Sequence, residues 1–128
     1  MPDYDIEKRD KFDSGPVDHD PDPVIFYLWR LPADSSREPE RMELRVYDER
    51  PGVILDMLQD AVDGFIEPVW LPEPVMFEGV PCEVYANEEG LLNNLPPNER
   101  GMDLCDWEGV WPLVGDIALV PVKCSHMV

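Results

Sequence analysis

Hydrophobic residues along this chain fall into short runs separated by turn-forming residues, and most of these runs suit β-strands. The run VIFYLWRL at 24–31 is β-branched and aromatic and is too short for a helix, so it predicts a well-buried strand. MELRVYD at 42–48 alternates apolar and charged residues, which predicts a half-exposed strand paired with the first as a hairpin. Further strands are expected within 65–72, within 75–87 on both sides of a Glu-Gly turn, and at 116–122.

The segment ERPGVILDMLQDAVDGF at 49–65 has the apolar spacing of three and four residues that is typical of an amphipathic helix. Its predicted apolar stripe is formed by Ile54, Leu58, Ala61 and Phe65. Gly64 is placed as the C-terminal cap of this helix. A second, short helix is predicted after Pro97, with Asn98 as its N-cap.

Few helices, many strands and no repeated strand-helix-strand unit predict an α+β fold. The fold would consist of a mostly antiparallel sheet, one main packed amphipathic helix and the short second helix. Residues 1–22 contain eight Asp or Glu residues and no helical or strand period, so they are interpreted as a disordered acidic arm. Residues 23–124 are expected to form a single domain, which agrees with a chain of 128 residues.

The charge balance excludes two classes of partner. The chain carries 28 Asp and Glu residues against 10 Lys and Arg residues, for a net charge of −18. Binding to phosphates needs clustered basic residues, so neither direct nucleic-acid binding nor attraction to an anionic membrane is expected. There is no apolar run long enough for a transmembrane helix, and the N-terminal residues lack the pattern of a signal peptide, so a cytoplasmic location is expected.

The cysteines and histidines do not form a recognisable catalytic or metal site. Cys82, Cys105 and Cys124 form no Cys-x-x-Cys pair and are odd in number, which indicates reduced thiols. Together with His126 they are scattered singly, unlike the paired ligands of a zinc site. His19 and His126 have no Ser or Cys partner in a supporting context for nucleophilic catalysis. No metal ion and no cofactor are therefore expected.

Glu88 and Glu89 are the first candidates for acid-base chemistry. Neighbouring residues of a strand point to opposite faces, so the pair cannot readily share a substrate, and no catalytic residue is predicted. The sequence NEEG at 87–90 is interpreted as a turn, with Gly90 free to adopt positive φ and Asn87 able to bond to the backbone. The alternative, a small-ligand or enzymatic site, would be formed by Asn87, Glu88, Glu89 and Asn98.

Four acidic residues on the polar side of the main predicted helix are the first candidate binding surface. They are Asp56, Asp60, Asp63 and Glu67. Their helical spacing would place neighbours about 5–6 Å apart in one stripe, comparable with the phosphates of a nucleic-acid backbone. The expected partner of such a stripe is a basic protein, in particular one that binds nucleic acid. A solvated helix face and adaptation to high salt are the alternative explanations.

Two tryptophans in a predicted loop are the second candidate binding surface. Trp107 and Trp111 bracket the tripeptide Glu-Gly-Val. Loops with exposed aromatic residues often carry recognition, so the pair is a candidate for partner binding. Burial of both rings in the core is the alternative.

Three motifs in order carry a resemblance to a known family. They are FIEPV at 65–69 after the helix, VYANEEGLLNNLPPNERG at 84–101, and GDIALV at 115–120. The chain from about residue 46 to residue 122 resembles the domain-of-unknown-function family 3846, which is common in phages, plasmids and actinobacterial genomes. The resemblance implies a small α+β domain and a phage or mobile-element setting, and it brings no established activity.

These observations together predict a small non-enzymatic interaction protein, phage-encoded and acting in the host cytoplasm if the resemblance holds. It would bind a host protein through its acidic face. Two alternatives stay open: a ligand-binding or enzymatic domain that uses the turn at 87–90, and a homo-oligomeric assembly module that uses an exposed sheet edge.

Overall fold

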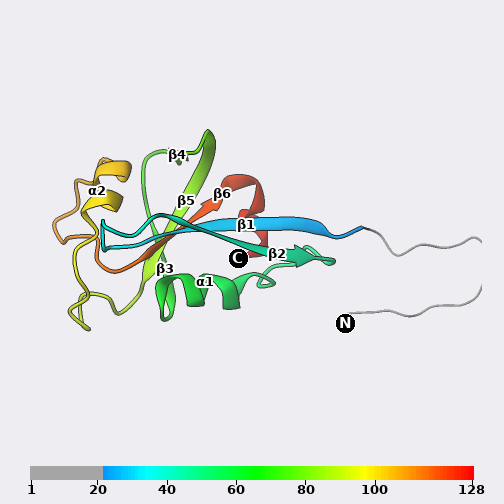
Figure 1. Ribbon diagram of the computed structural model, residues 1–128, viewed down its shortest axis with the longest axis horizontal. Helices are drawn as coiled ribbons and strands as arrows, with labels where there is room; N and C mark the ends of the chain where they lie inside the picture. The colour runs from blue at the N-terminus through cyan, green and yellow to red at the C-terminus, as the bar shows by residue number, and fades with distance from the viewer. Residues whose placement is uncertain (1–21) are drawn as a thin grey trace, which may run out of the picture.

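A computed structural model describes residues 22–128, so the acidic arm predicted for residues 1–22 lies, except for Asp22, outside the described residues. The described residues form one six-stranded antiparallel sheet with helices on both faces (Figure 1), which confirms the predicted α+β class. No helix in this part of the chain has both the length and the apolar character needed to cross a membrane.

The strands account for most of the regular structure. They are β1 (Val24–Leu31), β2 (Glu40–Val46), β3 (Ile66–Val69), β4 (Val75–Phe77), β5 (Val80–Asn87) and β6 (Ile117–Pro121). The helices are α1 (Leu55–Val62), α2 (Glu99–Cys105) and the 3-10 helix η1 (Val122–Met127). Neighbouring strands follow the order β2-β1-β6-β5-β3, and β4 also pairs with β5.

Both hairpins that the sequence predicts are present. β1 pairs with β2 so that Phe26 lies opposite Leu44. β4 and β5 are joined by Glu78 and Gly79, whose φ angles of 51° and 77° are both positive. Two positive φ angles give the two-residue turn whose twist matches that of the flanking strands. The Glu-Gly turn in the sequence therefore sets the β4–β5 register.

Strand β6 lies in the middle of the sheet, and all five of its residues are buried. Ile117 and Leu119 pack into the core on one face of the sheet, and Ala118 and Val120 pack into the core on the other face. Because both faces are covered, the strand reads as an unbroken apolar run and does not alternate with polar residues.

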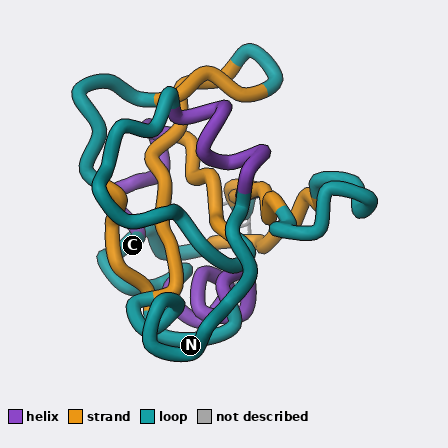
Figure 2. Tube along the Cα trace, turned by 90° about the vertical axis from the view of Figure 1, so that its left-hand side faces the viewer, coloured by secondary structure: helices purple, strands orange, loops and turns teal. Residues whose placement is uncertain are grey.

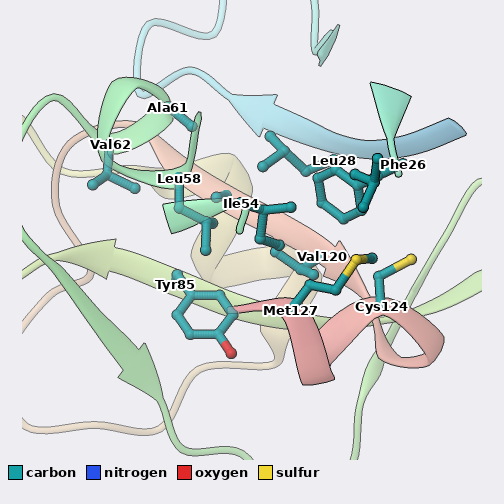
Figure 3. Packing of buried hydrophobic residues seen from close by; sticks show 12 residues of the cluster. Phe26, Leu28, Ile54, Leu58, Ala61, Val62, Tyr85, Val120, Cys124 and Met127 are labelled. Carbon is teal, nitrogen blue, oxygen red and sulfur yellow. The ribbon is translucent and has the colours of Figure 1, made fainter. Parts of the chain in front are cut away.

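Each face of the sheet has its own hydrophobic core. Helices α1 and η1 cover the face that carries Phe26 and Leu28 (Figure 3). Helix α2 and the segment 106–114 cover the face that carries Val84 and Leu119. Figure 2 shows α2 above and α1 below in its view, well apart from each other. The molecule is therefore a three-layer arrangement with the sheet in the middle.

Helix α1 ends earlier than the apolar spacing predicts. Three of the four predicted stripe residues are buried: Ile54, Leu58 and Ala61. The prediction for Phe65 is wrong, since this side chain is 64% exposed. The helix stops at Val62, and Asp63 adopts a left-handed conformation with φ 59°, so Phe65 no longer follows the helical period. Asp63 thus takes the capping position that the sequence predicts for Gly64.

Candidate functional site

The side chain of Asn87 joins the end of β5 to the end of α1. Its Nδ2 donates to the carbonyl oxygens of Val62 at 3.1 Å and Asp63 at 3.0 Å, and its Oδ1 accepts from the Glu89 backbone N–H at 2.8 Å. A Cβ atom on Gly64 would lie 2.5 Å from the same Nδ2, which explains a glycine there without a positive φ. The predicted bonding of Asn87 to the backbone is confirmed, and this bonding uses both of its polar atoms.

The glycine of this turn has a different role from the predicted one. Gly90 is absent from the residues with positive φ in the described chain. A Cβ atom at Gly90 would lie 2.7 Å from Cγ2 of Val114, so the glycine allows the turn to pack closely against the segment that leads into β6. Glu88 and Glu89 both lie exposed on the turn.

Asn98 is the most deeply buried polar side chain of the described residues, with 0% of its surface exposed. Its Oδ1 accepts from the Gly101 backbone N–H at 2.7 Å, which confirms the predicted N-cap of α2. Its Nδ2 donates to the carbonyl oxygens of Leu31 and Gly115, both at 2.9 Å. All three bonds tie chain segments to each other, so Asn98 is a structural centre with no atom turned towards a ligand.

The residues of the alternative ligand site therefore have two different environments in the structure. These residues are Asn87, Glu88, Glu89 and Asn98. The two asparagine side chains are committed to backbone partners, and the two glutamates are on the surface. A ligand-binding or catalytic site needs convergent polar groups with free hydrogen-bonding capacity. These four residues do not provide such a set.

The acidic surface of α1 is exposed along its length. Asp56, Asp60 and Asp63 are all exposed, and none of them forms a salt bridge with another residue of the range 22–128. Arg30 approaches the C-terminal end of α1 from β1. Its guanidinium donates to the backbone oxygens of Asp60 at 2.9 Å and Ala61 at 3.1 Å. Arg30 thus neutralises helix carbonyls and leaves the aspartate side chains free.

Glu67 does not continue this acidic stripe, so that part of the prediction is wrong. The residue belongs to β3, beyond the end of the helix, and it pairs with Ala86. Ala86 packs into the core on the α2 side of the sheet, and Tyr85, one residue earlier, packs into the core on the α1 side. Glu67 therefore projects from the face of the sheet opposite to α1.

Glu67 lies instead on a cleft of about 440 Å³ between β3 and the loop 107–114. The aromatic rings that line the cleft come from Trp70, Trp107 and Trp111. Trp70 follows β3 directly, and its 85% exposure makes it one of the most exposed large apolar residues of the described chain. The structure brings the two predicted loop tryptophans together with a third that is 37 positions before Trp107 in the sequence.

The two loop tryptophans have different environments. Trp107 is partly buried against the core of the α2 face, and its Nε1 donates to the Trp111 backbone oxygen at 2.9 Å. Trp111 is 68% exposed. A Cβ atom on Gly109 would lie 2.4 Å from the Trp107 ring, so the loop closes tightly over that ring. Trp107 fixes the loop, and Trp111 is presented on its surface.

Sequence reasoning missed Trp70 and Val110 as surface residues. Val110 is 92% exposed at the tip of the loop. A signal for Trp70 was present, because a proline two residues earlier indicates an edge strand, where one flank of the strand is open. The position of Val110 depends on the loop conformation, for which the sequence carries no period.

The three cysteines are free, buried and unsuited to thiol chemistry at neutral pH. Burial raises the pKa of Cys82 and the pKa of Cys105 to about 11, and it also raises the pKa of Cys124. A thiol reacts as the thiolate, so these residues are protonated and inert near pH 7. Within residues 22–128 no group of three His, Cys, Asp or Glu side chains is placed to hold a metal ion.

Comparison with known proteins identifies one family. A family model described as "Domain of unknown function (DUF3846)" matches residues 29–126. This range extends the resemblance seen in the motifs towards both ends, and it includes the end of β1 and all of β2. Neither a curated protein nor a solved structure matches the chain.

Proposed function

Because the chain belongs to a family of unknown function, DUF3846, over residues 29–126, its role has to be inferred from its own surfaces, and we propose a non-enzymatic interaction protein. It binds a basic protein partner through the acidic helix face, which consists of Asp56, Asp60 and Asp63. Glu67 is left out of this surface because it projects from the opposite face of the sheet.

The observation that carries the proposal is the placement of acidic residues at the wrong end of a helix. The C-terminal end of a helix has a partial negative charge, and acidic side chains there cost roughly 0.3–1 kcal/mol each. Helix α1 has no basic residue in its last turn, and it has Asp60 in that turn and Asp63 at the cap. This cost arises at a helix end whose backbone carbonyl oxygens already accept hydrogen bonds from the Arg30 guanidinium. Residues that lower stability in their local structure are common at functional positions.

A basic nucleic-acid-binding protein is the partner that suits this surface best. Asp56 and Asp60 are one helical turn apart, and Asp63 is the residue that caps the C-terminal end of the helix. Residues one helical turn apart have Cβ atoms about 5–6 Å apart, so their carboxylates present charges at intervals similar to those of a phosphate backbone. The net charge of −18 adds long-range attraction for a basic partner and speeds its association. A phage or mobile-element setting, implied by the family resemblance, would make this partner a host protein.

The proposal is tested by capturing partners from a host lysate on the immobilised full chain, at low and at high salt. We expect a stoichiometric basic protein at low salt and its loss at high salt, because exposed charge pairs are screened by ions. The triple variant Asp56→Lys, Asp60→Lys, Asp63→Lys should no longer capture this protein. Undiminished capture by the triple variant would overturn the proposal.

A matched variant separates loss of this face from a general change in charge. Glu38, Glu73 and Asp103 are exposed residues outside α1. Replacing all three by lysine changes the net charge by the same amount as the helix variant does. We expect this control to capture the partner nearly as well as the original chain, and circular dichroism should show both variants folded.

A further inference from the structure

The cleft between β3 and the loop 107–114 is built from parts of the chain that are far apart in sequence. Val69 and Trp70 come from β3 and the residue after it, and Val110 and Trp111 come from the loop. The floor between them includes Leu113, which is buried. The hydrogen bond from Trp107 Nε1 to the Trp111 backbone oxygen holds the loop side in place. The cleft is thus a formed feature with an apolar floor.

The walls of this cleft expose more apolar surface than a folded chain needs. Trp70, Val110 and Trp111 are each at least two-thirds exposed, and Leu91, which also lines the cleft, is about half exposed. Single exposed apolar residues are ordinary, whereas several around one hollow indicate a binding site. Tryptophan is also the residue type most enriched among those that dominate binding energy at interfaces.

The charges at the cleft have one sign. Its charged lining residues are Glu67 and Glu88, and none of the described residues that line it is Lys, Arg or His. Glu67 belongs to β3, Glu88 is the first residue of the turn after β5, and both line the same cleft. Two carboxylates on one cleft repel each other. A cation placed between them would relieve this repulsion.

The free edge of β3 favours recognition by side chains over the addition of a strand. The Glu88 backbone N–H donates to the Phe65 oxygen, so the alternating ladder turns the backbone groups of Ile66 and Pro68 outwards. Pro68 has no N–H, so the outward edge of β3 keeps the Ile66 donor and lacks the second donor that a further strand would use. This edge also gives little support to assembly of identical chains by strand pairing.

We infer that this cleft binds a cationic segment of a partner protein that inserts one bulky apolar side chain. The inserted side chain packs between Trp70 and Trp111, and an adjacent Lys or Arg lies between Glu67 and Glu88. The inference goes beyond the proposed function, since this cleft opens on the face of the sheet opposite to α1. A basic partner could engage both surfaces around the β3 edge, or the cleft alone.

The test uses the full chain and short amidated peptides with the sequence Arg-Arg-X-Arg-Arg, in which X is Trp, Phe or Leu. Binding is followed by nuclear magnetic resonance titration, with the indole N–H signals as reporters. We expect saturable shifts of the Trp70 and Trp111 signals. The peptide with X as Ala should bind roughly tenfold more weakly, because it lacks the buried side chain. A Glu-Glu-X-Glu-Glu series should not bind.

Two variants and one control locate the site. Trp70→Ala and Trp111→Ala should each weaken peptide binding about tenfold or more, and both chains should fold because the rings are exposed. Glu67→Gln with Glu88→Gln should weaken binding about two- to fivefold and reduce its dependence on salt. Tyr47→Ala removes an exposed aromatic ring that does not line the cleft, and it should leave binding unchanged.

Three results would overturn the inference: no saturable binding of any cationic peptide, equal binding of the Ala peptide, or equal effects of Tyr47→Ala and Trp70→Ala. The triple lysine variant of α1 distinguishes this inference from the proposed function. It should lose the lysate partner and keep peptide binding. If it keeps the partner while Trp111→Ala loses it, the cleft inference stands and the acidic-face proposal fails.

Discussion

The two faces of the sheet are closed by different means. On one face, α1 presents regularly spaced apolar side chains to β1, β5 and β6 (Figure 3). Side-chain hydrogen bonds from Arg30 and Asn87 fasten only the C-terminal end of this helix. On the other face, a seven-residue helix and a long irregular segment cover the strands, and they are held by hydrogen bonds from a few polar side chains. Periodic apolar side chains pack against the first face, and individual polar side chains hold the cover of the second face in place.

Asn98 and Arg100 carry much of the closure on the second face. Asn98 joins the start of α2 to the end of β1 and to Gly115. Arg100 donates to the backbone oxygens of Pro32 and Arg37, which ties α2 to the loop between β1 and β2. The segment that covers this face is irregular and does not cover the sheet completely. The cleft lined by Trp70 and Trp111 lies at its edge. Regular packing therefore supports the core under α1, and the irregular cover of the other face leaves the cleft open.

The largest effect is expected on the regular face. Leu58→Ala removes a fully buried side chain from α1 and leaves a cavity against the sheet. Such substitutions cost about 2–5 kcal/mol of unfolding free energy. Urea denaturation followed by circular dichroism measures the loss. A cost below about 1 kcal/mol would mean that α1 is not the main support of this core, and the contrast between the faces would fail.

A slightly smaller effect is expected from a single polar substitution on the irregular face. Asn98→Asp keeps the acceptor of the N-cap, and aspartate is as good an N-cap as asparagine in an exposed helix. In this position it loses the two donations to Leu31 and Gly115 and places a carboxylate against their carbonyl oxygens. A buried polar group without its partner costs about 1–3 kcal/mol. We expect Asn98→Asp to destabilise the fold by about 2–3 kcal/mol in the same denaturation experiment.

Asn98→Ser provides the comparison for this substitution. Serine also caps helices, and it brings no charge into the buried site. If Asn98 acted only as a cap, both variants would be nearly neutral. If the donations to β1 and Gly115 matter as the structure indicates, both variants lose stability, and the aspartate variant loses more at neutral pH than in acid, where its carboxyl group is protonated.

The same contrast explains what the sequence predicts well and what it does not. Strand β1, the β4–β5 hairpin and the buried side of α1 follow from local periods and turn residues, and the structure confirms them. The N-cap role of Asn98 also follows from local chemistry. Its donations to residues 67 positions and 17 positions away along the chain do not, because no local pattern encodes them.

The candidate surfaces show the same limit. Asp56, Asp60 and Asp63 follow a helical period, and the structure keeps them exposed together at α1. The helical period does not extend to Glu67. The helix ends before Asp63, and Glu67 projects from the opposite face of the sheet. The cleft combines Trp70 with Trp111 across two separate segments, so only the fold brings them together.

The smallest effect concerns Asp63, where the stability of the fold and the proposed function make opposite demands. Asp63 has a φ of 59°, a conformation that costs a non-glycine residue roughly 1 kcal/mol, and its carboxylate lies at the unfavourable end of α1. Asp63→Gly removes both costs, so we expect the fold to gain about 0.5–1 kcal/mol in thermal or urea denaturation. The same variant removes one of the three carboxylates of the acidic helix face, and capture of the basic partner should weaken. A neutral or destabilising effect would show that Asp63 has a structural role, and the argument from a misplaced acidic residue would then lose its basis.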